Sequence, residues 1–330
     1  MASDKPIIAI ATGDPAGIGP EISLKAALDP AVRAACRPLL VGDPELLARH
    51  AAACGIKADL YTVTSPGKAN WSDDRIQVLA IRSRSQNAIA LGATCAEAGA
   101  ASIGFVRSAI WMARSNEVAA VVAAPQNETS IALAGIPFDG HPSFVARETG
   151  TPEDNVFMML CFGNTKISHA TLHQSVRQAI DAITSERVER VIDETARTLR
   201  RMGIAGPRIA VSGLNPHAGE GGLFGREEIE IIRPAIDAAV ADGLNVAGPF
   251  GADTMFHMPG FDAFVVMLHD QGHIAAKLLA EHAAAALTIG TPILFSSVAH
   301  GSAHDIAGKG VADPTAMIEA VLRMAGARRA

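Results

Sequence analysis

The amino-acid sequence predicts an α/β protein with a mainly parallel sheet, and three observations support that class. Short apolar runs bounded by Gly, Pro and Asp recur along the chain, and longer segments with helical spacing lie between them. The 330 residues suffice for two domains or one large α/β unit. Hydrophobic residues make up 49% of the chain and charged residues 19%, so a sizeable core is available. Strands that alternate with helices in this way are typical of βαβ units.

The expected elements can be placed by residue number. Apolar runs predict strands at Ile7–Ala11, Leu39–Val41, Ile76–Ile81, Val118–Ala124, Val156–Cys161, Lys166–Leu172, Arg208–Ser212, Phe264–Leu268 and Ile293–Val298. Helical spacing predicts helices at Pro44–Cys54, Ala93–Ser115, Ser185–Met202 and Arg226–Ala241. Repeats, low-complexity tracts and Pro/Ser-rich linkers are lacking, so composition does not mark a domain boundary.

Charge and apolar distribution exclude several classes of partner. The chain has 28 Lys and Arg against 34 Asp and Glu, a net charge of −6, and no long basic run that would bind nucleic acid or an anionic membrane. Its apolar stretches are far shorter than the roughly 18 residues of a membrane span. The N-terminus lacks a signal-peptide pattern, and the four cysteines show no CxxC spacing. We therefore expect a cytoplasmic protein without nucleic-acid or membrane partners.

Three of the eleven histidines come directly after predicted strands: His173, His217 and His269. In an open parallel sheet the carboxyl ends of the strands form the ligand crevice. Three imidazoles at such ends are suited to one divalent metal. Spacing alone does not show that they converge, so three unrelated surface or core histidines are the alternative.

Two glycine-rich segments are candidate ligand loops. Ala11–Ile22 (ATGDPAGIGPEI) joins a strand to a helix, but it lacks the GxGxxG order, and a plain βα turn is the alternative. His300–Pro314 (HGSAHDIAGKGVADP) follows an apolar run, and its small residues allow close approach to a flat ligand. Asp305 is placed to accept hydrogen bonds from ribose hydroxyls. A loop without a ligand is the alternative here too.

Together, these motifs resemble those of the 4-hydroxythreonine-4-phosphate dehydrogenase family over nearly the whole chain. The motifs are GDPAGIGPEI (13–22), AGIPFDGH (134–141), GLNPHAGEGG (213–222), GADT (251–254), HDQG (269–272) and HGSAHDIAGKG (300–310). The last also resembles the adenosine-binding loop of isopropylmalate dehydrogenases. The resemblance implies two α/β domains with a central cleft, as in isopropylmalate and isocitrate dehydrogenases. We expect a discontinuous nucleotide-binding domain at 1–130 plus 275–330, and a metal, substrate and dimerisation domain at 131–274.

The resemblance also assigns the metal and the cofactor. It implies that His173, His217 and His269 bind a divalent metal in a homodimer whose metal site uses both subunits. Three neutral imidazoles suit zinc and leave positions open for substrate oxygens. It implies that the second glycine-rich loop binds NAD through Gly301, Ser302 and Asp305. The Asp305 carboxylate would repel a 2′-phosphate, which favours NAD over its phosphorylated relative.

Further residues fall at substrate and catalytic positions of the family. His141 and Lys277 match positions that contact substrate. Lys277 is also the candidate for proton transfer, with an exposed helix lysine as the alternative. Asp253 is a weaker catalytic candidate, for orienting a ligand or base. Phe295 offers an apolar wall suited to a six-membered ring.

The chain departs from the phosphate-specific members at four positions. Their Lys, Thr, Asn and Arg are replaced by Glu128, Pro142, Ala286 and Phe295. The loss of donors and cations, with the gain of an acid, would leave a phosphate dianion poorly held. Other segments resemble the terephthalate dihydrodiol dehydrogenase branch of the family, namely Gln126–Ile136, His141–Ser143, Leu172–Arg177 and Leu268–Ala280.

These observations predict a metal- and NAD-dependent dehydrogenase that oxidises a hydroxyl β to a carboxylate. Hydride leaves to the nicotinamide, and the β-keto acid that results loses CO₂. The favoured substrate is a carboxylated cis-dihydrodiol such as terephthalate 1,2-cis-dihydrodiol. The alternative within the family is 4-hydroxythreonine-4-phosphate, in vitamin B6 biosynthesis. A non-catalytic small-molecule binding protein is the alternative from another class, and the histidine set and nucleotide loop argue against it.

Overall fold

The structure is a computed structural model that describes residues 5–72, 74–83, 85–279 and 285–326. The chain forms two compact units. We call Met1–Gly150 together with Pro292–Ala330 unit 1, and Thr151–Thr291 unit 2. None of the described helices has the length and apolar character needed to cross a membrane.

Both boundaries between the units fall later in the chain than the sequence predicts. α6 (His141–Thr149) packs against α4 (Ala96–Arg114), so the chain as far as Gly150 belongs to unit 1. β11 (Ala285–Ile289) pairs with β6 (Phe157–Phe162), which places it in unit 2. Helix packing and strand pairing decide this division, and composition does not mark either of them.

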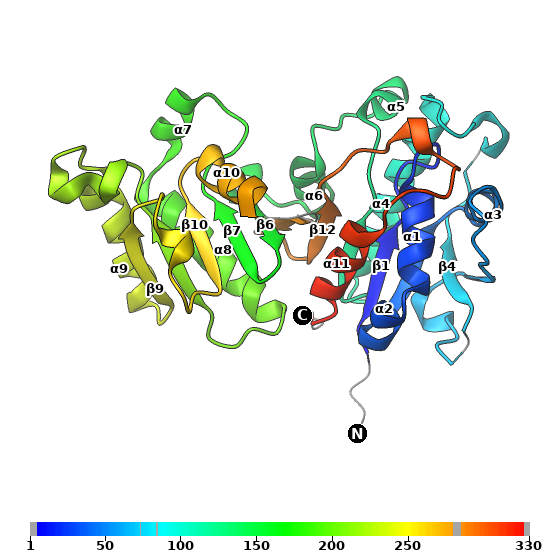
Figure 1. Ribbon diagram of the computed structural model, residues 1–330, viewed down its shortest axis with the longest axis horizontal. Coiled ribbons are helices and arrows are strands. Elements are labelled where there is room, and N and C mark those ends of the chain that lie inside the picture. The colour runs from blue at the N-terminus through cyan, green and yellow to red at the C-terminus, as the bar shows by residue number, and fades with distance from the viewer. Residues whose placement is uncertain (1–4, 73, 84, 280–284, 327–330) are drawn as a thin grey trace. The chain divides into compact units, whose positions relative to one another are not determined.

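Unit 1 is a parallel sheet with helices packed on it (Figure 1). Its described strands lie in the order β3-β4-β2-β1-β5-β12, and neighbouring strands are parallel. The strands are β1 (Ile7–Ala11), β2 (Arg37–Gly42), β3 (Leu60–Val63), β4 (Ile76–Ala80), β5 (Ala120–Ala123) and β12 (Phe295–Val298). Besides α4 and α6, the helices are α1 (Gly19–Leu28), α2 (Pro30–Ala35), α3 (Pro44–Ala53), α5 (Glu128–Leu133) and α11 (Thr315–Met324), with short turns η1 (Pro66–Lys68), η2 (Gln86–Ala88) and η7 (His304–Ile306).

Local sequence explains these elements. Every residue of β1 is buried, as a central parallel strand covered on both faces requires. Asp29 and Asp43 precede Pro30 and Pro44, and each carboxylate accepts hydrogen bonds from two backbone amides of the helix that follows. An Asp cap with Pro at the first helical position is a strong start signal. α3 begins at Pro44, as predicted, and α2, which was not predicted, begins in the same way.

Unit 2 is a mixed sheet in the order β11-β6-β7-β10-β8-β9. β6 is antiparallel to both of its neighbours, and the remaining pairs are parallel. Its other strands are β7 (Thr165–His169), β8 (Arg208–Ser212), β9 (Asn245–Phe250) and β10 (Ala263–Val266). Its helices are α7 (Val176–Ala182), α8 (Ser185–Arg201), α9 (Arg233–Ala241) and α10 (His269–Leu279), with short turns η3 (Glu153–Asn155), η4 (Pro216–Gly222), η5 (Glu228–Ile232, a π-helix) and η6 (Met255–His257).

The predicted elements correspond to elements of the structure, with shifted ends. The strand expected at Lys166–Leu172 ends at His169, and the helix expected at Arg226–Ala241 is the π-helix η5 followed by α9. Strands β3, β9 and β11 were not predicted. β9 contains Gly248 and Pro249, which weaken a strand pattern, and β11 (AALTI) begins with helix-favouring alanines. The predicted α/β class with a mainly parallel sheet is confirmed.

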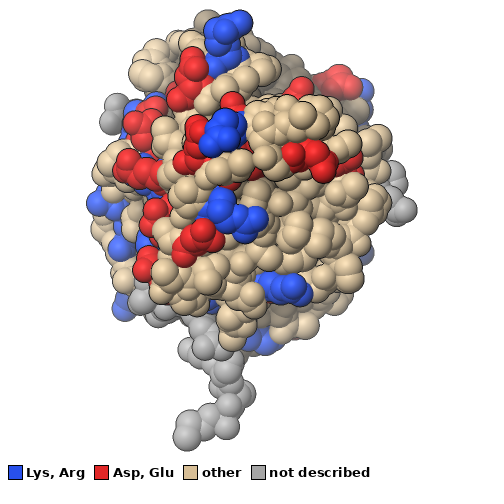
Figure 2. Space-filling view, turned by 90° about the vertical axis from the view of Figure 1, so that its left-hand side faces the viewer, with Lys and Arg blue, Asp and Glu red and all other residues tan. Residues whose placement is uncertain are grey.

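The surface drawn in Figure 2 mixes the two signs of charge. Acidic and basic side chains are interspersed over part of this face, and a broad area carries few charged side chains. Neither sign gathers into a continuous patch there, so this face has no strong electrostatic preference for a partner of one sign.

The close packing of α4 on α5 yields a stability prediction. A Cβ at Gly99 would overlap the backbone of Ser130 and Ile131, whereas nothing lies within 4 Å of a Cβ at Gly104 in the same helix. We expect Gly99→Ala to lower the free energy of unfolding by about 1–3 kcal/mol. The matched Gly104→Ala should raise it by about 0.5–1 kcal/mol, the usual gain in a helix interior. Urea unfolding of both variants checks this, and equal effects would contradict it.

Candidate functional site

In unit 2, the structure brings together two of the three predicted metal-ligating histidines. The ring centroids of His173 and His269 lie 5.5 Å apart. His173 lies in the loop between β7 and α7, where a capping box formed by Ser175 and Gln178 fixes the start of α7. His269 is the first residue of α10. One imidazole from a loop and one from the start of a helix are therefore adjacent.

The HDQG motif explains how His269 is held. The Gln271 side-chain oxygen accepts hydrogen bonds from the backbone amides of Met267 and Leu268, both at 2.9 Å. Its side-chain nitrogen donates to the Gly213 carbonyl at 3.0 Å. His269 Nδ1 lies 2.7 Å from a carboxylate oxygen of Asp270. Donation from Nδ1 to that oxygen leaves the Nε2 lone pair free for a ligand.

His217, the third predicted ligand, lies apart from that pair. It is in η4, where residues 217–221 all have positive φ, and its side chain is 66% exposed. Buried Glu228 holds this segment by accepting 2.7 Å hydrogen bonds from the backbone amides of Leu214 and Asn215. Within the residues that the structure describes, no three His, Cys, Asp or Glu side chains form a group that could hold a metal. The three-imidazole site expected at the strand ends is thus not formed within one chain.

Two further histidines that the sequence did not single out extend from His269: His273 contacts it, and His169 contacts His273. His273 stacks on His269 with ring centroids 3.7 Å apart, and His169 lies 4.8 Å from His273. Burial lowers the pKa of His169 to about 3, and burial followed by the charge of His269 lowers the pKa of His273. Gly272 makes room for this array, since a Cβ there would overlap His169. The i, i+4 spacing of His269 and His273 was the available signal.

The predicted catalytic residues of unit 2 lie near the same helix. Lys277 is exposed in the last turn of α10, and its charge contributes to the lowered pKa of His273. Asp253 is exposed in the turn before η6. A hollow of about 380 Å³ is lined by Asp253 and by residues along α10 from Asp270 to Leu279.

In unit 1, the two glycine-rich segments form one structure. The backbone amide of Ile18 donates to the Ser302 carbonyl at 2.9 Å, and a Cβ at Gly17 would overlap Ser302. Ser302 is buried, whereas Gly301 and Asp305 are exposed. The sequence treats the segments as separate candidates. The structure shows that the first supports the second.

The predicted substrate residues of unit 1 form an aromatic cluster. The His141 ring lies 5.3 Å from Phe295 and 5.4 Å from Phe138, between ring centroids. Burial lowers the pKa of His141 to about 4, and its Nε2 has no hydrogen-bond partner among the described residues. A neutral imidazole with an unpartnered nitrogen can bond to a ligand. Phe295 is only 1% exposed and packs against the His141 ring.

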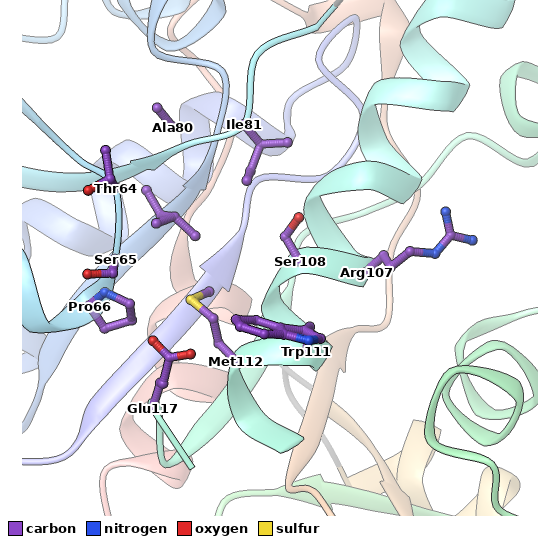
Figure 3. A pocket seen from close by; sticks show the side chains of 11 residues that line it. Thr64, Ser65, Pro66, Ala80, Ile81, Arg107, Ser108, Trp111, Met112 and Glu117 are labelled. Atoms are coloured by element: carbon purple, nitrogen blue, oxygen red, sulfur yellow. The ribbon is translucent and has the colours of Figure 1, made fainter. Parts of the chain in front are cut away.

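Unit 1 also contains a hollow of about 510 Å³ away from these residues. In Figure 3, Trp111 and Met112 of α4 face Ser65 and Pro66 across it. None of the predicted site residues lines this hollow, so its volume does not identify a functional site.

Comparison with known proteins identifies both the enzyme class and the family of this chain. Relatives over nearly the whole chain are named as dehydrogenases. The chain belongs to the family described as pyridoxal phosphate biosynthetic protein PdxA, whose model matches residues 34–325. The predicted family resemblance is confirmed.

Relatives of similar identity carry different substrate names. A D-threonate 4-phosphate dehydrogenase from Cupriavidus necator is 40% identical over 97% of each chain. A 1,2-dihydroxy-3,5-cyclohexadiene-1,4-dicarboxylate dehydrogenase from Comamonas sp is also 40% identical, over 95% of this chain and 95% of the relative. A 4-hydroxythreonine-4-phosphate dehydrogenase from Trichlorobacter lovleyi is 39% identical over 98% of each. Identity alone therefore does not select the substrate.

Solved structures agree with this family. A 4-hydroxythreonine-4-phosphate dehydrogenase from Burkholderia phymatum matches with a TM-score of 0.90 and 37% identity, covering 98% of this chain and 99% of that one. A terephthalate 1,2-cis-dihydrodiol dehydrogenase from Burkholderia xenovorans matches with a TM-score of 0.78 and 40% identity. The match covers 97% of this chain and 98% of that one. The expected likeness to isocitrate dehydrogenase is distant: the enzyme from Methylococcus capsulatus has a TM-score of 0.40 and 16% identity.

Proposed function

We propose that this chain is a metal- and NAD-dependent dehydrogenase that oxidises a hydroxyl β to a carboxylate, with decarboxylation. We propose a carboxylated cis-dihydrodiol, such as terephthalate 1,2-cis-dihydrodiol, as its substrate, and the cytoplasm as its location. The observation that carries the proposal is the adjacent pair of His173 and His269, with ring centroids 5.5 Å apart. These two imidazoles would supply two of the three nitrogen ligands of the proposed metal site.

The donor set fits a divalent metal. Imidazole nitrogen is a preferred ligand of zinc, and Asp270 holds His269 in the tautomer that leaves Nε2 free. His273 stacks on His269 and restricts the rotation of its ring. A bound metal would stabilise negative charge on the substrate oxygen, as Lewis-acid catalysis requires.

We propose that His217 completes the metal site of a second copy of the chain, in a homodimer. His217 is 66% exposed and its ring lies 6.1 Å from that of Phe224. Phe224 and Leu223 are themselves 48% and 72% exposed. Exposed large apolar side chains around a potential ligand are typical of an interface rather than of a free surface. Isologous pairing would give each of the two sites one such histidine from the other subunit.

The proposed NAD site is the His300–Pro314 loop of unit 1. Gly301 has nothing within 4 Å of where a Cβ would be, so a flat ligand has room to approach its backbone. Buried Ser302 anchors the loop, and exposed Asp305 offers a carboxylate to ribose hydroxyls. The same carboxylate would repel a 2′-phosphate, which favours NAD.

The proposed substrate agrees with the side chains at four positions. Glu128 is exposed in the first turn of α5 and would repel a phosphate dianion. Pro142, Ala286 and buried Phe295 supply no polar side-chain donor. A ring diol acid does not need those donors, and His141 packed on Phe295 offers it a neutral imidazole.

In the proposed reaction, residues of unit 2 move and hold protons. Lys277 would bind the substrate carboxylate or transfer a proton, because its ammonium is exposed on the helix that begins with His269. Asp253 would orient the base or a ligand, because it lines the same hollow as residues of α10. A bound NAD would accept the hydride from the carbon that bears the hydroxyl, and the β-keto acid that results would lose CO₂.

A phosphorylated hydroxy acid is the second candidate substrate. The relatives named for D-threonate 4-phosphate and 4-hydroxythreonine-4-phosphate, at 40% and 39% identity, favour it. In that case the chain would act in vitamin B6 synthesis or on a related phosphorylated acid. The absence of a cation or polar donor at Glu128, Pro142, Ala286 and Phe295 argues against this candidate.

The shared metal site is tested by mixing inactive variants. We expect His217→Ala and His269→Ala each to abolish turnover with little effect on folding, since each removes one exposed or half-buried ligand. Denaturing and refolding the two together in equal amounts forms mixed dimers with one intact site each. Activity should recover to about a quarter of the native value. No recovery, with dimers shown by light scattering, would contradict a shared site, and full activity of either variant would remove the metal assignment.

Cofactor choice is tested at Asp305. Asp305→Ala should raise KM for NAD by about tenfold or more, because hydrogen bonds from ribose hydroxyls to a charged acceptor are lost. Asp305→Asn keeps an acceptor without the charge, so it should raise KM less and still narrow the preference for NAD over NADP. Steady-state kinetics with both cofactors measures this. A native enzyme that used NADP better would contradict the assignment.

Substrate class is tested by comparing kcat/KM under identical metal and NAD conditions. The carboxylated dihydrodiol should exceed 4-hydroxythreonine-4-phosphate and D-threonate 4-phosphate by on the order of a hundredfold, since two or more charge-assisted bonds to phosphate are missing. Glu128→Lys, at an exposed position, should shift the ratio toward the phosphorylated acids. Native turnover of either phosphorylated acid at an equal or higher kcat/KM would replace this proposal with the second candidate.

A further inference from the structure

Unit 1 packs the His300–Pro314 loop between two other segments. On one side, Ile18 N donates to the Ser302 carbonyl at 2.9 Å, and Gly17 has room only for hydrogen because the Ser302 Cβ would lie 2.7 Å from a Cβ there. On the other side, a Cβ at Gly92 would lie 2.8 Å from the His304 carbonyl. The backbone on either side of Ala303 is therefore closely confined.

One side-chain pair joins this loop to the turn after β1. His304 Nε2 lies 2.6 Å from Oδ2 of Asp14, which is 1% exposed. The other carboxylate oxygen of Asp14 accepts a 2.9 Å hydrogen bond from the backbone amide of Ala16. A buried carboxylate is tolerated only when its oxygens are hydrogen-bonded, so Asp14 depends on His304 for its second donor.

The bond from His304 also holds an unfavourable backbone conformation. Ala303 has φ +40° and ψ +61°, the left-handed region that residues with a Cβ rarely adopt. Its neighbours Ser302 and His304 are both bonded to the turn after β1. Two anchors on either side of one strained residue keep the chain in that conformation.

We propose that the Asp14–His304 pair is a latch that sets the shape of the nucleotide loop before the cofactor binds, and that His304 is a positioning residue for Asp305. The proposal rests on the proposed NAD-dependent function. Asp305 follows His304 in the same turn, η7, and is exposed, so the direction of its carboxylate depends on how that turn is held. The Asn127 side-chain nitrogen donates to Ser302 Oγ at 3.4 Å and adds an anchor from the residue before α5.

Two substitutions at His304 separate the effect of its hydrogen bond to Asp14 from the effect of its side-chain volume. His304→Gln keeps an N–H donor able to reach Asp14, whereas His304→Leu keeps similar volume without a donor. In ligand-free protein, we expect hydrogen exchange of the amides of residues 300–310 to be about tenfold faster in His304→Leu. The His304→Gln variant should stay within about threefold of the native chain. Unchanged exchange in His304→Leu would overturn the latch, whether or not a dinucleotide binds.

Calorimetric titration with NAD tests the positioning role in the same variants. His304→Leu should raise Kd by about tenfold, and His304→Gln should largely restore it. Asp14→Asn should weaken binding in the native background and add little in the His304→Leu background, because the two residues act through one bond. Faster loop exchange with an unchanged Kd would overturn the positioning role. A native chain that exchanges as expected but does not bind NAD would overturn the proposed function and leave the latch standing.

Discussion

The side-chain amide of Gln271 organises the candidate site of unit 2. It bonds to the backbone amides of Met267 and Leu268 and to the carbonyl of Gly213, so one side chain satisfies three backbone groups from two loops. Backbone polar groups near a core need such partners, and each one left without a bond costs about 1–3 kcal/mol. The bonds fix the point at which β10 passes into α10, and His269 is the first residue after that point. The position of the metal-site candidate thus follows from a hydrogen-bonding requirement.

The same requirement shapes the other site loops. Buried Glu228 collects the amides of Leu214 and Asn215 and holds the left-handed segment that displays His217. Asp14 collects the amide of Ala16 and the ring of His304. Loops that carry function are irregular, and a buried polar side chain at the base of each one gives it a single conformation. His217 in unit 2 and the His300–Pro314 loop in unit 1 are therefore held by buried carboxylates.

The chemistry of unit 2 extends beyond the residues that motif matching identifies. His273 stacks on His269, and the ring of His169 is tilted against that of His273, so two further imidazoles adjoin a potential metal ligand. Burial lowers the pKa of His169 to about 3, so this imidazole is neutral near pH 7. In unit 1, Phe295 plays a similar supporting part, since it is buried and packs against the neutral ring of His141.

The sequence by itself determined the α/β class, most of the strands, the dehydrogenase family and the loops on which the candidate residues lie. These follow from periodicity, from Asp-Pro and glycine signals, and from long motifs, all of which are local. Only the tertiary structure decided that His173 and His269 are neighbours while His217 is exposed and apart, and that Asp14 meets His304. It also decided the unit boundaries and the unpredicted strands β3, β9 and β11. The physical reason is that these features depend on pairing and hydrogen bonds between distant segments, which no local pattern encodes.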